Sequence, residues 1–525
     1  MRTTYSRSLF RSRVLPVLVT TVAIMLAVLA VLTLRPGGWL SGATAGSAAQ
    51  AALPVPGAVG AAPKVCGSTA LAGPVAAPTG AVTVTTGERL SAVVSEHDPG
   101  TTYWLAPGVH RLSDAPFDQV LPKDGDRFVG APGAVLDGQH KNRYAFGGHG
   151  AGVTISFLTV ENFGAKGLNN NEGVVNHDSA SGWTFESTTL QHNAGAAVML
   201  GSQNRLLNSC LRENGQYGFN AYSADGVAGV TMEGNEIAGN NTDDWEVLEP
   251  GCGCTGGGKF WSTKDATITG NNVHDNHGVG IWVDNNNAGF LISGNWITGN
   301  DAEGVMYETS YNAAILGNTF ERNGLVKGPQ NKKFPTAAVY ISESGADERV
   351  ATAHDDALRV ANNRFVDNWS GVVAWENADR FAGSPANTST GQAPLVNPGV
   401  ATATSCAERG NVSRKPYFDD CRWKTQNVLV EDNTFSVDPN NIALCAHATS
   451  CGFNGLFSNF GSYPRWSPYK GEVVAQDLAF KQNNVFRRNT YIGDWQFVAE
   501  EMGNAVGWDA WRGAPYGQDA GSTTG

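Results

Sequence analysis

The sequence is poor in basic residues. Its 525 residues include 36 Lys and Arg against 48 Asp and Glu, which gives a formal net charge of -12. Nucleic-acid binding needs a basic stripe, which this sequence lacks, so we expect no nucleic-acid partner. Basic residues are also sparse around the central repeats, and this weighs against a uronate substrate, because an acidic polymer needs basic groups or a bridging cation in its groove.

The central part of the chain also lacks the helical spacing of apolar residues. Short apolar-polar alternations, typical of strands with one buried face, recur there every 23 or 24 residues in the segments 266–289, 290–312 and from 313 onward. Gly and Asn, which tolerate left-handed backbone at tight turns, separate the alternations. The aligned columns contain Ile268, Ile292 and Ile315; Val273, Ile297 and Phe320; and Val279 or Ile281, then Val305.

A fixed period of this length, built from short strands and turns, is typical of a solenoid whose repeats must stack to bury their apolar faces. Leu is scarce in the columns, which argues against leucine-rich repeats. Weaker copies, such as "GVTISFLTVENF" from 152 and "NVLVEDNTFSVD" from 427, extend the pattern from roughly residue 80 to 500. The sequence therefore predicts one elongated parallel β-helix, in which the recurrent Asn amides hydrogen-bond along the axis.

The G-N-x-[VIF]-x-x-N strings, preceded by "YWLAPGVHRL" and "FVGAPGAVLDGQHKNRYAF", resemble the right-handed parallel β-helix (pectate-lyase-like) superfamily. The resemblance implies an all-β fold, a right-handed single-stranded parallel β-helix solenoid with loop excursions. It leaves function open, because the superfamily includes polysaccharide lyases, glycoside hydrolases, epimerases, phage tailspikes and proteins with no known activity. "NTDD" at 241–244 is similar to polygalacturonase motifs, but the partner motifs of that family are missing, and its activity is not carried over.

The N-terminal region predicts a membrane anchor. A basic cytoplasmic tail (1–13) precedes 21 uncharged, mostly apolar residues (14–34), long enough to span a bilayer as a signal anchor or uncleaved signal. We therefore expect a single-pass protein of the cell membrane with its β-helix outside; the alternative is secretion after cleavage near "ATA" at 43–45.

The expected domain order behind the anchor is simple. An Ala/Gly/Pro-rich linker (35–80) leads to a β-helix domain (81–510), with long loop insertions near 240–262 and 378–425, and a flexible tail (511–525) ends the chain. We expect a monomer, with the segment after Tyr491 as a cap on the last coil.

Eight cysteines in an exported chain suggest disulfides. The spacing favours the pairs Cys406–Cys421 and Cys445–Cys451, where the repeat is interrupted. Cys252 and Cys254 have poor geometry for a mutual bridge, and no second Cys or His pair offers zinc-like spacing. Cys66 and Cys210 would make the number of cysteines even, but the connectivity stays open.

Two carboxylates share one position of the repeat. Aligning Gly280 with Gly304 places Asp284 over Glu308 on neighbouring coils, about 4.8 Å apart. Ionised carboxylates at that distance repel and raise each other's pKa, so the pair indicates either a glycosidase acid pair or a structural site that caps turns or binds a cation. Lys259 and His274 are further catalytic candidates, as a base or an acid.

Aromatic and acidic residues near this pair suggest a binding surface. The expected substrate contacts are Trp261, Trp282, Tyr307, Tyr311, Asp244 and Glu246. No cofactor is required by these residues; if calcium is used, its expected ligands are Asp243, Asp244, Glu246, Asp284 and Glu308.

The leading hypothesis from the sequence is a membrane-tethered carboxylate-dependent glycoside hydrolase acting on a polysaccharide or cell-envelope glycan. The alternatives are a calcium-dependent polysaccharide lyase with Lys259 as base, and a non-catalytic protein for glycan binding or adhesion.

Overall fold

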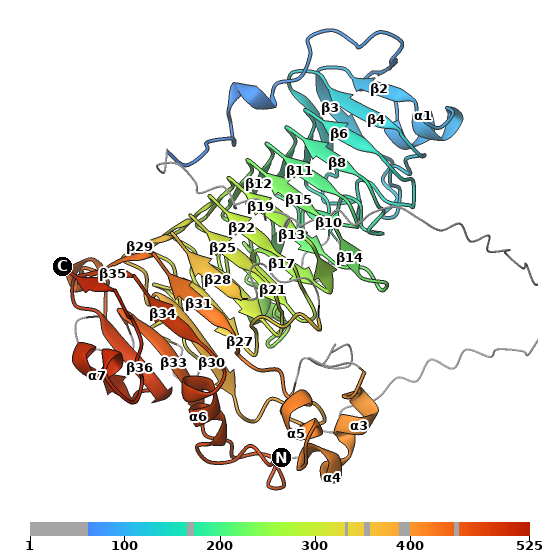
Figure 1. Ribbon diagram of the computed structural model, residues 1–525. Helices are drawn as coiled ribbons and strands as arrows, with labels where there is room; N and C mark the ends of the chain where they lie inside the picture. Colours follow the sequence, from blue (N-terminus) through green and yellow to red (C-terminus); the bar gives the residue numbers. More distant parts are fainter. Residues whose placement is uncertain (1–60, 165–172, 331–333, 351–356, 388–398, 446–450) are drawn as a thin grey trace, which may run out of the picture. The chain divides into compact units, whose positions relative to one another are not determined.

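The computed structural model describes residues 61–525 except 165–172, 331–333, 351–356, 388–398 and 446–450. The chain winds in successive coils that build three long sheets, here called A, B and C (Figure 1). Neighbouring strands are parallel throughout, apart from one antiparallel pair at the C-terminal end of sheet C. The expected cytoplasmic tail, the anchor and the start of the linker lie outside the described residues, within which no helix is long and apolar enough to cross a membrane.

Sheets A and B have 13 strands each. In spatial order, sheet A consists of β1 (Val82–Val84), β2 (Thr102–Leu105), β4 (Arg127–Gly130), β6 (Thr154–Ser156), β8 (Thr184–Glu186), β11 (Arg205–Leu207), β15 (Thr231–Glu233), β19 (Thr267–Thr269), β22 (Leu291–Ser293), β25 (Ala314–Leu316), β28 (Leu358–Ala361), β31 (Val428–Glu431) and β34 (Val485–Arg487). Sheet B consists of β3 (Gly108–Arg111), β5 (Ala134–Asp137), β7 (Thr159–Glu161), β9 (Thr189–Gln191), β12 (Cys210–Arg212), β16 (Glu236–Ala238), β20 (Asn272–His274), β23 (Trp296–Thr298), β26 (Thr319–Glu321), β29 (Arg364–Val366), β32 (Thr434–Ser436), β35 (Thr490–Ile492) and β38 (Thr523–Thr524).

Sheet C has ten strands and begins several coils later. It consists of β10 (Val198–Leu200), β13 (Tyr217–Ala221), β17 (Gly256–Trp261), β21 (Ile281–Asp284), β24 (Val305–Glu308), β27 (Val339–Ser342), β30 (Val372–Asn377), β33 (Phe453–Asn459), β36 (Gln496–Glu501) and β37 (Ala505–Val506). A separate two-stranded parallel sheet is formed by β14 (Val227–Ala228) and β18 (Thr263–Lys264), which follow β13 and β17 in the sequence. The helices are α1 (Leu90–Glu96), α2 (Trp245–Leu248), α3 (Ala403–Ala407), α4 (Arg409–Val412), α5 (Tyr417–Asp420), α6 (Val473–Phe480) and α7 (Trp508–Arg512), with 3-10 turns at Thr69–Leu71 and Pro439–Asn441.

The apolar columns expected from the repeat form the core. Ile268, Ile292 and Ile315 pair in register across β19, β22 and β25, and the Val273 column pairs in the same way across sheet B. In the third column, where the sequence allowed Val279 or Ile281, the residue opposite Val305 is Ile281. These side chains are buried in one continuous cluster, as expected for a solenoid in which each coil covers the next.

The Asn residues form hydrogen-bonded ladders along the axis, as predicted. Between sheets A and B, each amide Nδ2 donates to the Oδ1 of the next Asn, as Asn271 does to Asn295 at 2.9 Å and Asn295 to Asn318 at 2.9 Å. A second ladder, between sheets B and C, runs through Asn240, Asn276 and Asn300. The ladders satisfy buried turn amides that water cannot reach.

The Gly-Asn dipeptide of the repeat has a geometric cause. Gly294, at φ 65°, makes the left-handed turn, and Asn295 then enters the ladder.

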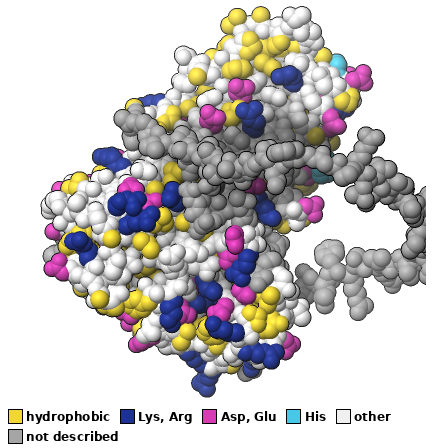
Figure 2. All heavy atoms as spheres, in the orientation of Figure 1, with side chains coloured by type: hydrophobic (Ala, Val, Ile, Leu, Met, Phe, Trp, Pro, Cys, Tyr) yellow, Lys and Arg dark blue, Asp and Glu magenta, His cyan; other side chains and the backbone are white. Residues whose placement is uncertain are grey.

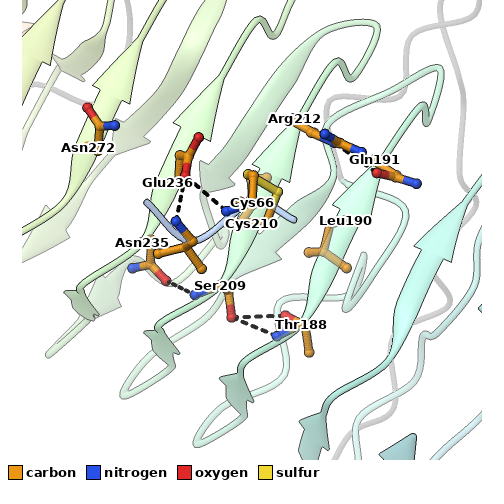
Figure 3. Close-up of a disulfide and its surroundings, with 12 residues drawn as sticks. Cys66, Thr188, Leu190, Gln191, Ser209, Cys210, Arg212, Asn235, Glu236 and Asn272 are labelled. Carbon is orange, nitrogen blue, oxygen red and sulfur yellow. Dashed lines mark hydrogen bonds between the residues drawn. A yellow bond between two sulfur atoms is a disulfide. The ribbon is translucent and has the colours of Figure 1, made fainter. Parts of the chain in front are cut away.

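The second half of the expected linker is a strap fixed to sheet B, rather than a free tether. Cys66 forms a disulfide with Cys210 of β12, and the Glu236 carboxylate accepts the backbone N–H groups of Val65 (2.6 Å) and Cys66 (2.9 Å) (Figure 3). The Asn272 amide of β20 donates to the Pro63 carbonyl at 3.3 Å. The part of the expected Ala/Gly/Pro-rich linker at residues 63–66 is therefore held against the β-helix by a disulfide and hydrogen bonds.

Both ends of the described stack are covered. At the N-terminal end, Leu90 and Val94 of α1 are buried in the core cluster. At the C-terminal end, Trp511 of α7 is fully buried and β38 adds to sheet B beside β35. Residues 511–525, for which we expected a flexible tail, thus belong to the packed cap, because an apolar ring and a strand edge both find partners there.

The predicted disulfides Cys406–Cys421 and Cys445–Cys451 are both present. Cys66 and Cys210 bond to each other, so Cys252 and Cys254 lie outside the three disulfides. The insertion near 378–425 carries α3, α4 and α5 and contributes a small apolar cluster that includes the Cys406–Cys421 bridge. On the face drawn in Figure 2, basic and acidic side chains of the described residues lie interspersed.

Candidate active site

The outward face of sheet C carries the predicted carboxylate pair. Asp284 ends β21 and Glu308 ends β24, and the two residues are register partners on adjacent strands, as the repeat alignment predicted. Their inward neighbours Val283 and Tyr307 are fully buried in the core, so strand alternation directs the carboxylates to the opposite face. Loops cover this face, and Asp284 and Glu308 are only 6% and 7% exposed.

Asp284 has a cationic partner on the preceding coil. The Lys259 ammonium lies 2.8 Å from Asp284 Oδ2, and both side chains are almost completely buried. The same ammonium lies over the Trp282 ring at 4.0 Å from its centroid. Burial raises the pKa of Asp284, the Lys259 charge acts against this rise, and the Glu308 charge adds to it.

Glu308 has a different cationic partner, from a distant part of the sequence. Arg380, in the insertion after β30, pairs through Nη1 with Glu308 and, at 3.3 Å, with Glu343 Oε2. The Trp282 indole N–H also donates to Glu308 at 3.3 Å. The two stacked carboxylates are thus separately compensated, which offsets the repulsion expected for a bare pair.

Two further buried carboxyl groups accompany the pair. Burial raises the pKa of Glu343, which is 1% exposed, to about 7. Burial also raises the pKa of Glu303, just before β24, to about 7. The negative charge of Glu308 contributes to the rise of both pKa values. Raised carboxyl pKa values of this kind occur at sites that transfer protons as well as in structural networks.

The sequence of the central coils matches a known family model. Residues 172–350 match the family described as right handed beta helix region. The central coils are thus similar to right-handed β-helix proteins. This agrees with the parallel sheets and with the resemblance stated from the sequence, and a search of curated proteins found no match.

Solved structures similar to this β-helix protein share little sequence identity with it. The Azotobacter vinelandii mannuronan C-5 epimerase AlgE6 A-module is 16% identical and has a TM-score of 0.40, with 57% of this chain and 79% of that chain covered. The catalytic domain of a GH87 alpha-1,3-glucanase in complex with nigerose is 11% identical with a TM-score of 0.44, covering 85% and 68%. The periplasmic alginate epimerase AlgG is 11% identical with a TM-score of 0.32, covering 80% and 83%.

Some of the predicted substrate-contacting residues lie near the Asp284 and Glu308 pair, and others lie elsewhere in the β-helix. Trp282 and Trp261 lie on the outward face of sheet C, and the Trp261 ring centroid is 5.2 Å from the Lys259 ammonium. Tyr307 points into the core, where its hydroxyl donates to the Tyr311 carbonyl at 3.0 Å. The expectation that Tyr307 contacts substrate was wrong, because strand alternation places it on the inner face.

Tyr311 and His274 also lie outside this site. Tyr311 is 2% exposed in the apolar cluster of the 378–425 insertion, and its hydroxyl bonds to the backbone of Lys424. His274 belongs to β20 in sheet B, where it faces Glu236 at 3.3 Å and Asp275 at 2.8 Å. We therefore withdraw His274 as a catalytic candidate and Tyr311 as a substrate contact.

The predicted loop insertion near 240–262 contacts the site through the backbone of Gly253. The Gly253 carbonyl accepts a hydrogen bond from Lys259 at 3.2 Å, and Gly253 lies directly against the Trp282 ring. Glu246 folds back onto its own loop and accepts the N–H groups of Gly251 and Gly253. Asp244 precedes α2 at the exposed surface. Glu246 and Asp244, which we expected to contact substrate, thus do not point to the carboxylate pair.

Asp243 lines a separate cavity of about 590 Å³, together with His140, His192 and Glu213. The five residues expected to hold calcium therefore do not converge, and among the residues that the structure describes no group of three or more His, Cys, Asp or Glu side chains could hold a metal ion.

Sequence reasoning missed Arg380, Glu343 and Glu303. Arg380 lies in an insertion outside the repeat, 72 residues from Glu308, so no periodicity pointed to it. Glu343 directly follows β27, whose last residue Ser342 is the register partner of Glu308, so the repeat did not place Glu343 in the column of the acid pair.

Proposed function

We propose that this β-helix protein acts on a polysaccharide or cell-envelope glycan as a carboxylate-dependent glycoside hydrolase, with Asp284 and Glu308 as its acid pair. The observation that carries the proposal is the row of buried, separately compensated carboxyl groups on the outward face of one sheet. Glycoside hydrolysis needs one carboxyl group that donates a proton and one that acts as a carboxylate.

The contacts favour different roles for the two acids. Arg380 and the Trp282 indole N–H both bond to Glu308, and both stabilise a carboxylate, which suits a nucleophile or base. Asp284 takes the proton-donor role, because burial raises its pKa against the opposing Lys259 charge, and the carboxylate left after proton donation forms the ion pair with the Lys259 ammonium at 2.8 Å. Lys259 then acts as a positioning residue that holds Asp284 beside the glycosidic oxygen.

A calcium-dependent lyase is the weaker enzymatic alternative. It would need Lys259 to be neutral in order to accept a sugar proton. The ion pair with Asp284 and the face of Trp282 both stabilise the ammonium instead. The scattered positions of the expected calcium ligands also count against it.

Glycan binding without turnover is the second candidate. The low exposure of the acid pair favours it, since Asp284 and Glu308 are covered while Tyr222 is 38% exposed. The two candidates make opposite predictions for product release.

We further propose that the protein is a monomer, single-pass in the cell membrane with its β-helix outside; release after signal cleavage is the alternative. The 21-residue apolar segment and its basic flank support the anchor. The three disulfides support an oxidising compartment. The covered ends of the stack support a monomer. Protease accessibility in intact cells and light scattering of the purified chain would test these points.

The test of the hydrolase compares reducing-sugar release from a polysaccharide panel by the wild type, Asp284→Asn and Glu308→Gln. Glu321→Gln is a matched control, because Glu321 is a partly exposed acid at the end of β26 in sheet B. We expect both site variants to lose at least about 100-fold in rate, with the control unchanged. EDTA should have no effect on the wild type.

Retained activity in Asp284→Asn and Glu308→Gln would refute the assignment of the acid pair. Activity lost with EDTA would move the assignment to the lyase. Binding to the panel without any product release would favour the non-catalytic protein.

A further inference from the structure

Two aromatic residues precede the acid pair in the same outward column of sheet C. Ala221 and Phe260 are register partners, so the next residues, Tyr222 and Trp261, occupy equivalent positions on adjacent coils. Trp261 in turn pairs with Asp284. Successive coils, whose strands β13, β17 and β21 lie side by side in Figure 1, thus present ring, ring and carboxyl at one position.

The two rings form a small platform. Their centroids are 6.4 Å apart and their planes meet at 75°. Tyr222 is 38% exposed and Trp261 is partly exposed, whereas the neighbouring acids are nearly buried. Strands of adjacent coils are about 4.8 Å apart, and Trp261 and Tyr222 lie one and two coils from Asp284.

The charges beside this platform are unfavourable for an anionic ligand. Lys259 is paired with Asp284 at 2.8 Å, and Arg380 is shared between Glu308 and Glu343. The two cations that contact the acid pair among the described residues are therefore both engaged by carboxylates of the protein. A uronate carboxylate would add a further negative charge next to these groups, where both contacting cations of the described chain are already paired.

We infer that the platform of Tyr222 and Trp261 binds an uncharged glycan, whose apolar ring faces pack on the two side chains beside Asp284 and Glu308. This inference rests on the proposed action on polysaccharide, and it names the chemical class of the substrate. The affinity comes from contact with the aromatic rings, whereas the carboxylates, whose cations are already paired, disfavour a negatively charged uronate.

The test measures binding by the full-length wild-type chain in the cold, with product release followed in the same samples, because Glu308→Gln would itself take one carboxylate partner from Arg380. The probes are neutral gluco- and manno-oligosaccharides and, matched in length, oligomers of galacturonate and mannuronate. Trp261→Ala and Tyr222→Ala are compared with Phe117→Ala, which removes a 66% exposed ring on an early coil. Circular dichroism melts identify any variant that fails to fold.

We expect binding of at least one neutral series, insensitive to salt, and no binding of the uronates. Trp261→Ala should weaken that binding at least about tenfold and Tyr222→Ala by a smaller factor, with Phe117→Ala unchanged. Asp284→Asn, which leaves Lys259 without its carboxylate partner, should introduce salt-dependent binding of uronates.

Three outcomes would overturn the inference: preferential binding of uronates by the starting protein, neutral binding that both platform variants leave unchanged, and binding of no probe at all. Neutral binding through the platform, together with no product release by the wild type, would instead refute the hydrolase and leave this inference standing.

Discussion

Truncation of one ladder amide should destabilise the β-helix strongly. Asn276 is fully buried and makes four side-chain hydrogen bonds, with the backbone N–H and amide of Asn240, the Ile237 carbonyl and the Asn300 amide. In Asn276→Ala, the buried N–H of Asn240 loses its acceptor, the other three bonds disappear, and a small cavity forms. At about 1 to 3 kcal/mol for a buried group left unsatisfied, plus the cavity, the free energy of unfolding should fall by roughly 3 to 5 kcal/mol.

The assay is urea unfolding followed by circular dichroism, with hydrogen exchange to locate the affected coils. Thr269→Ala is a matched control, because Thr269 is a partly exposed residue on the same coil. Asn276→Ser should lose less than Asn276→Ala, because Ser310 already serves as a ladder acceptor for Asn287, at 3.0 Å. A loss below about 1 kcal/mol for Asn276→Ala, equal to that of the control, would refute the view that the ladders stabilise the fold.

Three further predictions concern other parts of the molecule. Replacing Cys66 and Cys210, 144 residues apart, by Ser should lower the free energy of unfolding by up to about 5 kcal/mol, seen as a lower Tm under non-reducing conditions that keep the other two disulfides intact. Burial raises the folded pKa of Glu303 to about 7, above the ordinary 4.5, so the stability of the wild type is fully present below pH 4.5 and is lost as the pH rises through 7. Glu303→Gln should therefore be more stable than the wild type by roughly 3 kcal/mol at pH 8 and equally stable at pH 4. Equal thermal melts of the two proteins at pH 8 would contradict this. Arg380→Met takes the cation from Glu308 and Glu343 and should destabilise the protein by about 3 to 5 kcal/mol at pH 8. The loss should be smaller at pH 5, where Glu343, with its pKa of about 7, is protonated; a loss independent of pH would exclude the pairing with Glu343 as a cause.

Much of the architecture could be predicted because each coil repeats the same local rule. An inward Ile or Val, a left-handed Gly and a ladder Asn recur in each central copy, and stacking identical coils requires them in register. The same register predicted that Asp284 lies over Glu308. The face on which a side chain lies was harder to predict, as Tyr307 shows, because one residue of shift along a strand exchanges core and surface.

The sequence by itself determined the parallel β-helix, the axial Asn ladders, two of the three disulfides and the stacking of the acid pair. All of these follow from periodicity or short spacing within the chain. Only the tertiary structure decided the partners that come from outside the repeat: Arg380 from an insertion, Cys66 from the strap, and the separation of His274 from the acid pair on another sheet. The physical reason is that an insertion or a terminal segment has no register to follow, so its contacts depend on where the folded loop meets the stack.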